Sequence, residues 1–214
     1  MKSQIPNPLP AAGGQESQIK IIFATRNPGK VQEIKAILSD LPLDIKSLLD
    51  IPHLSEVIED GKTLEENALK KAREIFKATG LPTLSDDTGL EVFHLGMKPG
   101  VYSARYAGEH VRYEDNYRKL LRELEGVDVA QRRAQFRCVA AFVGQDLEKT
   151  TEGICTGVII NRPRGSGGFG YDPVFVPEGY NETFAELSTD IKNQISHRAK
   201  AFLQMKNFLF THFS

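Results

Sequence analysis

The chain has no tryptophan, only two cysteines and no long apolar run. No stretch approaches the roughly 18 consecutive apolar residues of a membrane-spanning helix, so we do not expect a membrane protein. Cys138 and Cys155 are too few for a disulfide framework, and we interpret them as buried, reduced thiols. Reduced thiols are typical of a cytoplasmic protein.

An excess of charge of either sign is also missing. The 27 basic and 28 acidic side chains give a formal net charge of −1. Nucleic-acid binding depends on a basic field, so the composition gives it no support. Apolar residues make up 40% of the 214 residues, which is enough for a sizeable core in one large domain or in one domain with two lobes.

The N-terminal segment differs in composition from the rest of the chain. MKSQIPNPLPAAGGQESQ, residues 1–18, contains three prolines and two glycines and lacks the continuous apolar core of a secretory signal. We therefore expect residues 1–18 to form a flexible extension and residues 19–214 to form the folded domain.

The first half of the chain alternates between strand and helix patterns. Strands are predicted at 20–24 and 43–48, and helices are predicted to begin after the capping residues Asn27 and Thr63. The second helix opens with the T-x-x-E pattern of a capping box and ends at Gly80, a typical C-terminal stop.

The second half contains a helix pattern at 117–124, two strands at 134–143 and 150–160 joined by a short turn, and a mostly helical segment at 195–210. The two strands predict an antiparallel hairpin. Because helices and strands alternate first and the hairpin comes later, the predicted fold class is α/β with a mixed sheet.

The segment TRNPGK (residues 25–30) has the layout of a phosphate-binding loop. A strand ends there, Gly29 lets the backbone approach a ligand, and the start of a helix offers free N–H groups. Lys30 adds a positive charge in the first turn, where the helix dipole disfavours a cation. The spacing is not that of a P-loop, and an ordinary capped helix with a surface lysine is the alternative.

The segment SDDTG contains adjacent carboxylates at Asp86 and Asp87. On a strand they point to opposite faces, so we expect one to do chemistry and the other to orient it or to fix a loop. Carboxylates of this kind bind Mg²⁺ beside substrate phosphates. An Asp-rich turn before Gly89 is the alternative.

Further acidic residues precede the second predicted helix. Glu56 and Glu59 lie in a loop that could reach a metal ion. Asn67 and Lys71 are four residues apart and therefore share a helical face, which either lines a cleft or meets water.

The segment GSGGFGYDP has four glycines between residues 165 and 170. Such a loop can lie against a flat ligand, and Phe169 and Tyr171 offer rings on which a base can stack. A flexible hairpin tip is the alternative. ISHRA places His197 and Arg198 near a helix start, where a surface pair is the ordinary interpretation.

Taken in order, the segments ATRNPGKVQEI, TLEENALKKA, SDDTGLEV, PGVYSARYAG, GGFGYDPVF and ISHRAKA closely resemble the inosine/xanthosine triphosphate pyrophosphatase family, the bacterial non-canonical purine NTP pyrophosphatases. The resemblance covers the chain from roughly Lys20 to its C-terminal end. It implies two α/β lobes around a long mixed sheet, with the substrate in the cleft between them. It also implies Mg²⁺-dependent hydrolysis of ITP, dITP and XTP to the monophosphate and pyrophosphate by a homodimer that cleanses the nucleotide pool.

The resemblance also assigns residues by motif. It implies a catalytic group in which Asp87 accepts a proton and neighbours the metal, together with Asp86, Lys30 and Lys71. The substrate contacts that it implies are Thr25, Arg26, Asn27, Pro28, Gly29 and Lys30 in the first loop, Thr88 after the aspartates, Phe169, Gly170, Tyr171 and Asp172 on the base side, and Lys192, His197 and Arg198 at the purine.

The motif match does not decide which residue supplies the second carboxylate to the metal. We expect Glu59 beside Asp87, and Glu56 remains the alternative. This chain also has Arg26 where many relatives have glycine, which adds charge and bulk to the first loop. We expect the backbone of the loop to be undisturbed.

Other functions fit parts of the same pattern. A related pyrophosphatase acting on modified pyrimidine nucleotides is one, but the ISHR segment matches the purine side. A nucleotide-binding regulator without turnover is another, but the presence together of Asp86, Asp87, Lys30 and Lys71 favours turnover. A structural or nucleic-acid-binding protein ranks last, because no basic stripe is visible in the sequence.

Overall fold

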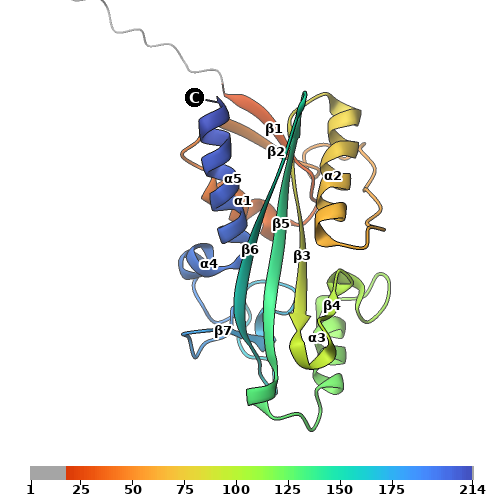
Figure 1. Ribbon diagram of the computed structural model, residues 1–214, viewed down its shortest axis with the longest axis vertical. Coiled ribbons are helices and arrows are strands. Elements are labelled where there is room, and N and C mark those ends of the chain that lie inside the picture. The colour runs from red at the N-terminus through yellow and green to blue at the C-terminus, as the bar shows by residue number, and fades with distance from the viewer. Residues whose placement is uncertain (1–17, 214) are drawn as a thin grey trace, which may run out of the picture.

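The computed structural model describes residues 18–213, so residues 1–17 of the expected extension lie outside the described part. The described residues build a long mixed β-sheet with helices on both faces (Figure 1). This architecture confirms the predicted α/β class. Within residues 18–213, none of the helices combines the length and the apolar character that crossing a bilayer requires.

The sheet has seven strands, of which six follow the order β2-β1-β3-β5-β6-β7 while β4 pairs with β3 outside this path. β1 runs parallel to β2 and β3, whereas β3, β5, β6 and β7 pair in antiparallel fashion. The predicted hairpin is therefore confirmed as β5 and β6. The strands are β1 Ile19–Phe23, β2 Leu43–Ser47, β3 Thr83–Val92, β4 Lys98–Gly100, β5 Arg133–Gly144, β6 Leu147–Ile159 and β7 Phe175–Pro177.

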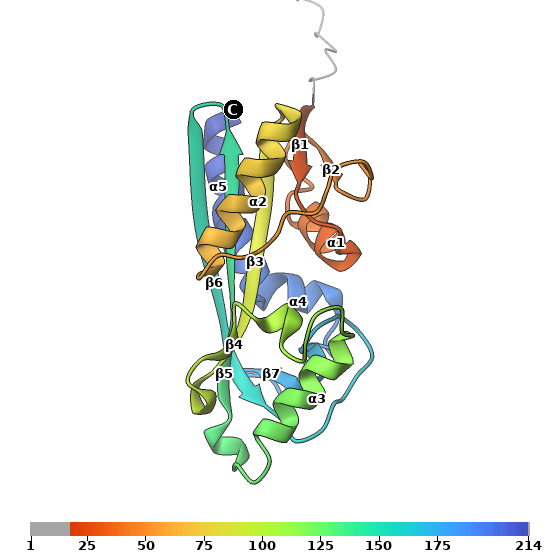
Figure 2. The same ribbon diagram turned by 90° about the vertical axis from the view of Figure 1, so that its right-hand side faces the viewer.

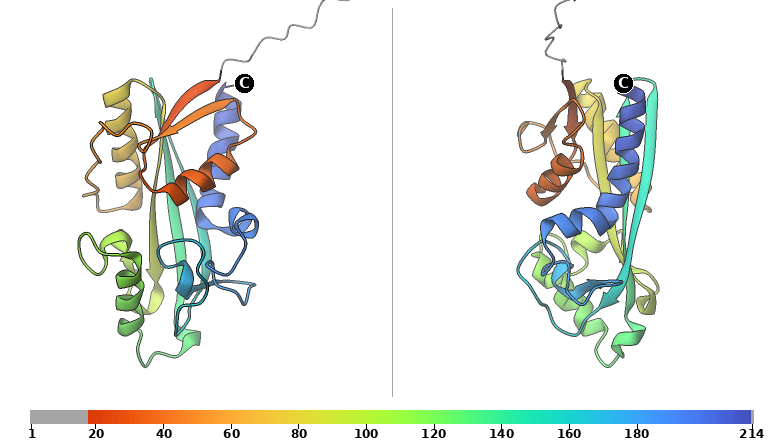
Figure 3. Two further views of the ribbon diagram at one scale, coloured as in Figure 1. Left: turned by 180° about the vertical axis from the view of Figure 1, so that it is seen from behind. Right: turned by 90° about the vertical axis from the view of Figure 1, so that its left-hand side faces the viewer.

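The helices cover the upper sheet on both sides, with α1 and α5 on one face and α2 on the other (Figures 1 and 3). Alternation along β5 produces this layering: Cys138, Ala140 and Phe142 pack with α1 and α5, and Val139, Ala141 and Val143 pack with α2. The helices are α1 Pro28–Ile37, α2 Leu64–Thr79, α3 Tyr113–Glu123, α4 Thr189–Ile195 and α5 His197–Phe213.

A second core cluster lies in the lower half, where Leu90, Phe136 and Phe175 pack with residues of α3. Figure 2 shows α3 below and α1 and α2 above, with the long strands β3, β5 and β6 running through both halves. The space between the two halves is where the sequence predicts a cleft.

The helix ends follow the capping signals in the sequence. The Asn27 side chain caps α1, and Thr63 Oγ1 accepts a hydrogen bond from the Glu66 N–H at 3.1 Å. Glu66 does not complete the capping box, because its carboxylate accepts from the Lys62 N–H at 2.6 Å instead of the Thr63 N–H. Gly80 ends α2 at a φ of 69°, a left-handed conformation that glycine adopts without strain.

One edge of β3 is open in the middle of the strand. β1 pairs with β3 only through Thr83 and Leu84, and β4 pairs with it only from Leu90 onward. Between these points, Asp86 and Thr88 have no backbone partner on this side among residues 18–213. Side chains satisfy the edge instead: Lys71 Nζ donates to the Asp86 carbonyl at 2.6 Å, and the Thr88 N–H donates to Asp87 Oδ1 at 3.0 Å.

Gly153 of β6 allows α5 to approach the sheet closely. A Cβ placed there would lie 2.1 Å from the His197 carbonyl oxygen and 2.5 Å from the Ala201 nitrogen. We predict that Gly153→Ala lowers the free energy of unfolding by about 1–3 kcal/mol, because backbone must shift to relieve the overlap. Urea unfolding checks this, with Gly144→Ala as the control.

The control is matched because Gly144 lies in the adjacent strand, and its added Cβ would meet only the ring of Phe142 at 3.2 Å. At this distance the ring has to shift by only a few tenths of an ångström, so we expect the smaller loss there. Equal losses in the two variants would contradict the close approach of β6 and α5.

Candidate active site

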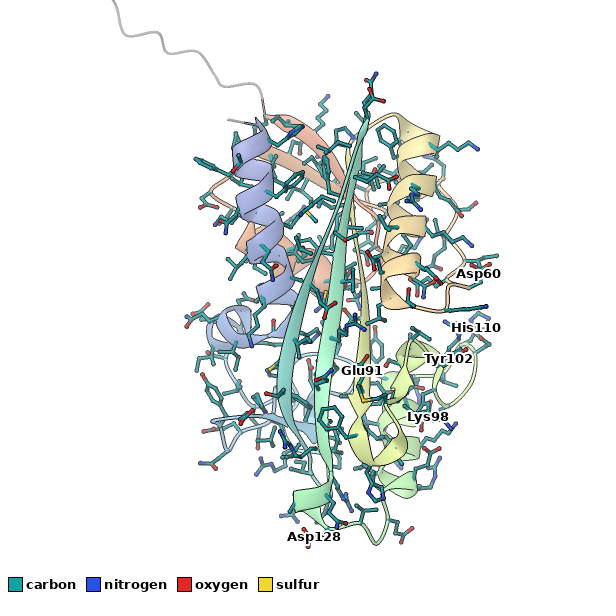
Figure 4. All side chains as sticks on the ribbon, in the orientation of Figure 1. Asp60, Glu91, Lys98, Tyr102, His110 and Asp128 are labelled. Carbon is teal, nitrogen blue, oxygen red and sulfur yellow. The ribbon has the colours of Figure 1, made fainter. Side chains whose placement is uncertain are left out.

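A cavity of about 770 Å³ opens at the free edge of β3. Its walls come from the β1–α1 loop, the loop before α2, α2 itself, the N-terminal end of α3, the glycine-rich loop and the start of α5. Asp60 and His110 both line the cavity, and Figure 4 shows Asp60 in the upper half of the molecule and His110 in the lower half. The volume is in the range of small-molecule sites.

The β1–α1 loop presents side chains, rather than free helix N–H groups, to the cavity. Asn27 Oδ1 accepts from the Gly29 and Lys30 N–H groups at 2.9 and 3.2 Å, so the expectation that these two groups are free is wrong. The physical reason is the cap itself, which uses the first donors of α1. Thr25, Arg26, Asn27 and Lys30 are the residues of this loop that line the cavity.

Pro28 and Gly29 do not line the cavity, although both were expected among the substrate contacts. Gly29 packs against the ring of Phe169, since a Cβ added at Gly29 would lie only 2.9 Å from that ring. The missing side chain therefore makes room for an aromatic ring of the glycine-rich loop.

Asp86 is buried and neutralised by two cations. Its Oδ2 lies 3.0 Å from Lys30 Nζ and 3.2 Å from Arg198 Nε, and it accepts from Thr88 Oγ1 at 3.1 Å. Burial raises the pKa of Asp86, but Lys30, Arg198 and Lys71 outweigh burial and hold the pKa below its usual value. Asp86 itself does not line the cavity.

Asp87 faces the opposite way, toward α2 and the cavity. Its Oδ2 accepts from Asn67 Nδ2 at 3.0 Å, and its Oδ1 lies 3.8 Å from Lys71 Nζ. Burial and the negative charge of Glu59 raise the pKa of Asp87, against the lowering effect of Lys71 and Lys30. The two aspartates thus have different environments, and the alternative of an Asp-rich turn is wrong because both lie within β3.

Asn67 and Lys71 line the inner side of α2 and do not meet water. Asn67 is fully buried and Lys71 is 7% exposed. Lys71 Nζ lies 2.5 Å from Glu59 Oε1, so Glu59 and Asp87 share one ammonium group. Burial lowers the pKa of Lys71, but Asp87, Glu59 and Asp86 raise it above the usual value.

Glu59 fits a divalent cation better than Glu56 does. Glu59 and Asp87 lie close enough for the charge of Glu59 to raise the pKa of Asp87, whereas Glu56 is an exposed residue of the cavity wall. Among residues 18–213 no three His, Cys, Asp or Glu side chains gather around one point. A pair of carboxylates is the kind of protein ligand that Mg²⁺ takes, since this ion keeps several waters and shares substrate phosphates.

The opposite end of the cavity is built around Lys192. Its Nζ lies 2.7 Å from Asp172 Oδ2 and 3.0 Å from Glu33 Oε1, and it sits 4.8 Å from the centre of the Phe169 ring. Arg198 also contacts the Glu33 carboxylate, with Nη1 2.6 Å from Oε2. Glu33, which sequence reasoning missed, thus links α1 to the two cations of α4 and α5.

His197 is buried and uncharged. Burial and the neighbouring charges of Arg198 and Lys192 hold the pKa of His197 well below its usual value. Its ring stacks on Phe136 with the centroids 4.6 Å apart, and Nδ1 has no hydrogen-bond partner within residues 18–213. His197 also lines the cavity, and a neutral imidazole can recognise a ligand there by hydrogen bonding through one of its ring nitrogens.

Arg26 and Tyr171 hold neighbouring loops in place. Arg26 donates to the carbonyl groups of Leu48 at 3.0 Å and Leu54 at 2.5 Å, which ties the β1–α1 loop to the segment leading to Glu59. The Tyr171 hydroxyl donates to the Ser103 carbonyl at 2.9 Å. The side chain of Arg26 therefore serves the loop architecture as well as the cavity wall.

Most of the expected site residues are brought together. Those that line the cavity are Thr25, Arg26, Asn27, Lys30, Glu56, Glu59, Lys71, Asp87, Thr88, Phe169, Gly170, Tyr171, Asp172, Lys192, His197 and Arg198. Sequence reasoning missed Arg105, Tyr113 and Phe136 in the same wall. Arg105 lies within the motif PGVYSARYAG, to which no residue role was assigned, whereas no motif marks Tyr113 or Phe136.

We predict that Asp86→Asn lowers the free energy of unfolding at neutral pH by about 3–5 kcal/mol, because Lys30 and Arg198 lose their shared anion. The folded pKa of Asp86 is depressed, so its contribution is present above the unfolded pKa and is lost as pH falls toward the folded value. The difference in the free energy of unfolding between wild type and variant should therefore shrink as pH falls from about 5 to about 2.

Urea unfolding of both proteins across this range measures the gap. Asp146→Asn is the matched control, because Asp146 is exposed in the β5–β6 turn and has a φ of 58° that asparagine tolerates. A gap that stays constant in acid would count against an ionised Asp86 as the stabilising group.

Comparison with known proteins finds one family model, described as the Ham1 family, that matches residues 21–208. A curated dITP/XTP pyrophosphatase of Bacillus licheniformis is 51% identical over 89% of this chain and 97% of its own length. A protein of the same name from Geobacter sulfurreducens is 51% identical over 89% and 96%.

Solved structures of Ham1 proteins are also similar to this chain. A HAM1 protein from Coxiella burnetii superposes with a TM-score of 0.82 at 37% identity, covering 90% of this chain and 99% of that one. The Staphylococcus aureus Ham1 protein superposes with a TM-score of 0.79 at 40% identity and the same coverage.

Proposed function

Because the chain belongs to the Ham1 family, we propose that it is a pyrophosphatase of non-canonical purine nucleotides, hydrolysing dITP, XTP and ITP to the monophosphate and pyrophosphate. The observation that carries the proposal is the division of one cavity into two ends. At the first end, Lys71 pairs with Glu59 beside Asp87, and at the second end, Lys192 lies over the ring of Phe169. Lys30 and His197 line the same cavity. A triphosphate and a purine require these two environments.

Phosphate binding falls to the cations and polar side chains at the first end. Lys30 and Lys71 each form an ion pair with a carboxylate, which holds both ammonium groups in position before substrate arrives. Fixed positive charge of this kind stabilises the negative charge that develops on a reacting phosphate. Asn27 Nδ2 and Thr25 Oγ1 lie in the same wall and supply neutral hydrogen bonds.

Asp87 is the proton acceptor in this proposal. Its carboxylate lines the cavity, and Asn67 holds Oδ2 in place by a hydrogen bond of 3.0 Å. The attacking water loses its proton to Asp87 as its oxygen bonds to the α-phosphorus, and the bond to the pyrophosphate leaving group breaks. Asp87 and Glu59 would hold a Mg²⁺ ion, which when bound neutralises phosphate charge as a Lewis acid.

The second end of the cavity, around Phe169 and Lys192, recognises the base in this proposal. Phe169 carries the ring on which a purine can stack, with Lys192 and Arg198 already over it. His197 is neutral, so it can offer one ring N–H to the 6-oxo group that hypoxanthine and xanthine share. Adenine has an amino group there, which would leave that donor unpaired at a cost of about 1–3 kcal/mol.

We further propose that residues 19–214 act as one domain, and that the protein works as a cytoplasmic homodimer that cleanses the nucleotide pool. The family resemblance supports the dimer, and two free, buried cysteines suit a reducing compartment. Light scattering coupled to gel filtration tests the dimer.

We predict that pyrophosphate release in Mg²⁺ is faster from dITP and XTP than from GTP, ATP or modified pyrimidine triphosphates. Asp87→Asn should fold and bind dITP but lose about 10²–10⁴-fold in turnover, the usual worth of a general base. Asp146→Asn, the same change at an exposed turn, should keep full turnover. Tight dITP binding by the wild type without pyrophosphate release would instead support a regulator.

A second prediction separates the two candidate metal carboxylates. Glu59→Gln should raise the Mg²⁺ concentration for half-maximal activity by at least about tenfold, a loss typical even of groups one step removed from a metal. Glu56→Gln should leave it nearly unchanged, because no ion pair or hydrogen bond links Glu56 to Asp87 or Lys71 in the described part of the chain. The reverse order of effects would transfer the role to Glu56.

A further inference from the structure

Tyr113, the first residue of α3, reaches across the cavity from the lower half of the molecule. Its hydroxyl oxygen accepts a hydrogen bond from Asn27 Nδ2 at 3.0 Å, 86 residues earlier in the chain. The residue is 48% exposed, so this contact lies at the mouth rather than in the floor. A tyrosine from α3 therefore meets the loop to which phosphate binding is assigned.

The position of Tyr113 is fixed from its own side. Asp115 accepts from the Arg112 N–H at 3.0 Å and so closes the first turn of α3. Asn116 is buried, accepts from the Ala107 N–H at 2.7 Å and donates to the Ala104 carbonyl at 3.0 Å. These bonds attach the start of α3 to the segment that forms the lower wall of the cavity.

The position is also fixed from the other side. Asn27 Oδ1 accepts from the first N–H groups of α1, so the amide cannot turn, and Nδ2 must point away from the helix toward Tyr113. Because the Tyr113 oxygen accepts this bond, its own proton remains available. Within residues 18–213 no hydrogen-bond acceptor for that proton is found.

The ring of Tyr113 lies beside the aromatic end of the cavity. Its centroid is 6.2 Å from that of Phe169, at an interplanar angle of 41°. Phe169 in turn packs on Gly29 of the β1–α1 loop. Tyr113 thus contacts the β1–α1 loop through its hydroxyl and lies beside Phe169 through its ring.

We infer that Tyr113 is a substrate-binding residue that donates its hydroxyl proton to the phosphate tail, an inference that rests on the proposed function. A phosphate oxygen is the acceptor that this donor lacks, and the bond gains strength from the acceptor's charge. Asn27 sets the direction of the hydroxyl, and a neutral donor adds binding without another cation beside Lys30.

The test compares Tyr113→Phe with Tyr117→Phe. Phenylalanine keeps the ring beside Phe169 and removes only the hydroxyl. Tyr117 lies one turn along the same helix in the lower core and makes the matched control. Calorimetry in Mg²⁺ measures the binding of two probes, inorganic tripolyphosphate and deoxyinosine, to each variant and to the wild type.

Tyr113→Phe should weaken tripolyphosphate binding by about tenfold or more, the worth of a hydrogen bond to a charged group. Deoxyinosine binding should be unchanged, KM for dITP should rise in step with the tripolyphosphate constant, and kcat should stay within about twofold of wild type. Tyr117→Phe should match wild type in every measurement.

Two results would overturn the inference. Equal weakening of both probes would mean that the hydroxyl only holds the cleft in shape, and unchanged tripolyphosphate binding would mean that it touches no phosphate. Failure of the proposed function appears separately, as absence of pyrophosphate release from dITP by the wild type. Because binding is measured directly, a wild type without turnover would still report on Tyr113.

Discussion

The buried carboxylate of Asp86 is the constraint on which the rest of the site depends. A charge taken out of water is tolerated only beside partners of opposite sign, and Asp86 finds them in Lys30 of α1 and Arg198 of α5. Arg198 then needs Glu33, and Glu33 also holds Lys192, which contacts Asp172. Three cations and three carboxylates alternate along this path.

This network joins elements that the chain separates widely. Arg198 and Glu33 are 165 residues apart, and Arg198 and Asp86 are 112 apart. Because each charge is compensated only when α1, α4 and α5 take their observed places on the sheet, the network couples the assembly of the core to the assembly of the cavity. The end assigned to phosphate and the end assigned to the base share it.

The open edge of β3 gives the two aspartates their different environments. Alternation along a strand turns Asp86 toward α1 and α5 and Asp87 toward α2, while the missing neighbour strand leaves room for a ligand beside them. Two of the backbone groups at that gap, the Asp86 carbonyl and the Thr88 N–H, are satisfied by Lys71 and by the side chain of Asp87. The same side chains that repair the sheet therefore face the cavity.

By itself the sequence determined the local features: the cap at Asn27, the stop at Gly80, the β5–β6 hairpin and the opposite orientations of Asp86 and Asp87. Short-range geometry and hydrogen bonding decide these, so neighbouring residues carry enough information. Only the tertiary structure decided that Gly29 makes room for Phe169, that Glu33 joins two cations and that Tyr113 meets Asn27. Those contacts depend on how distant segments pack, and packing is a property of the whole chain that no local pattern records.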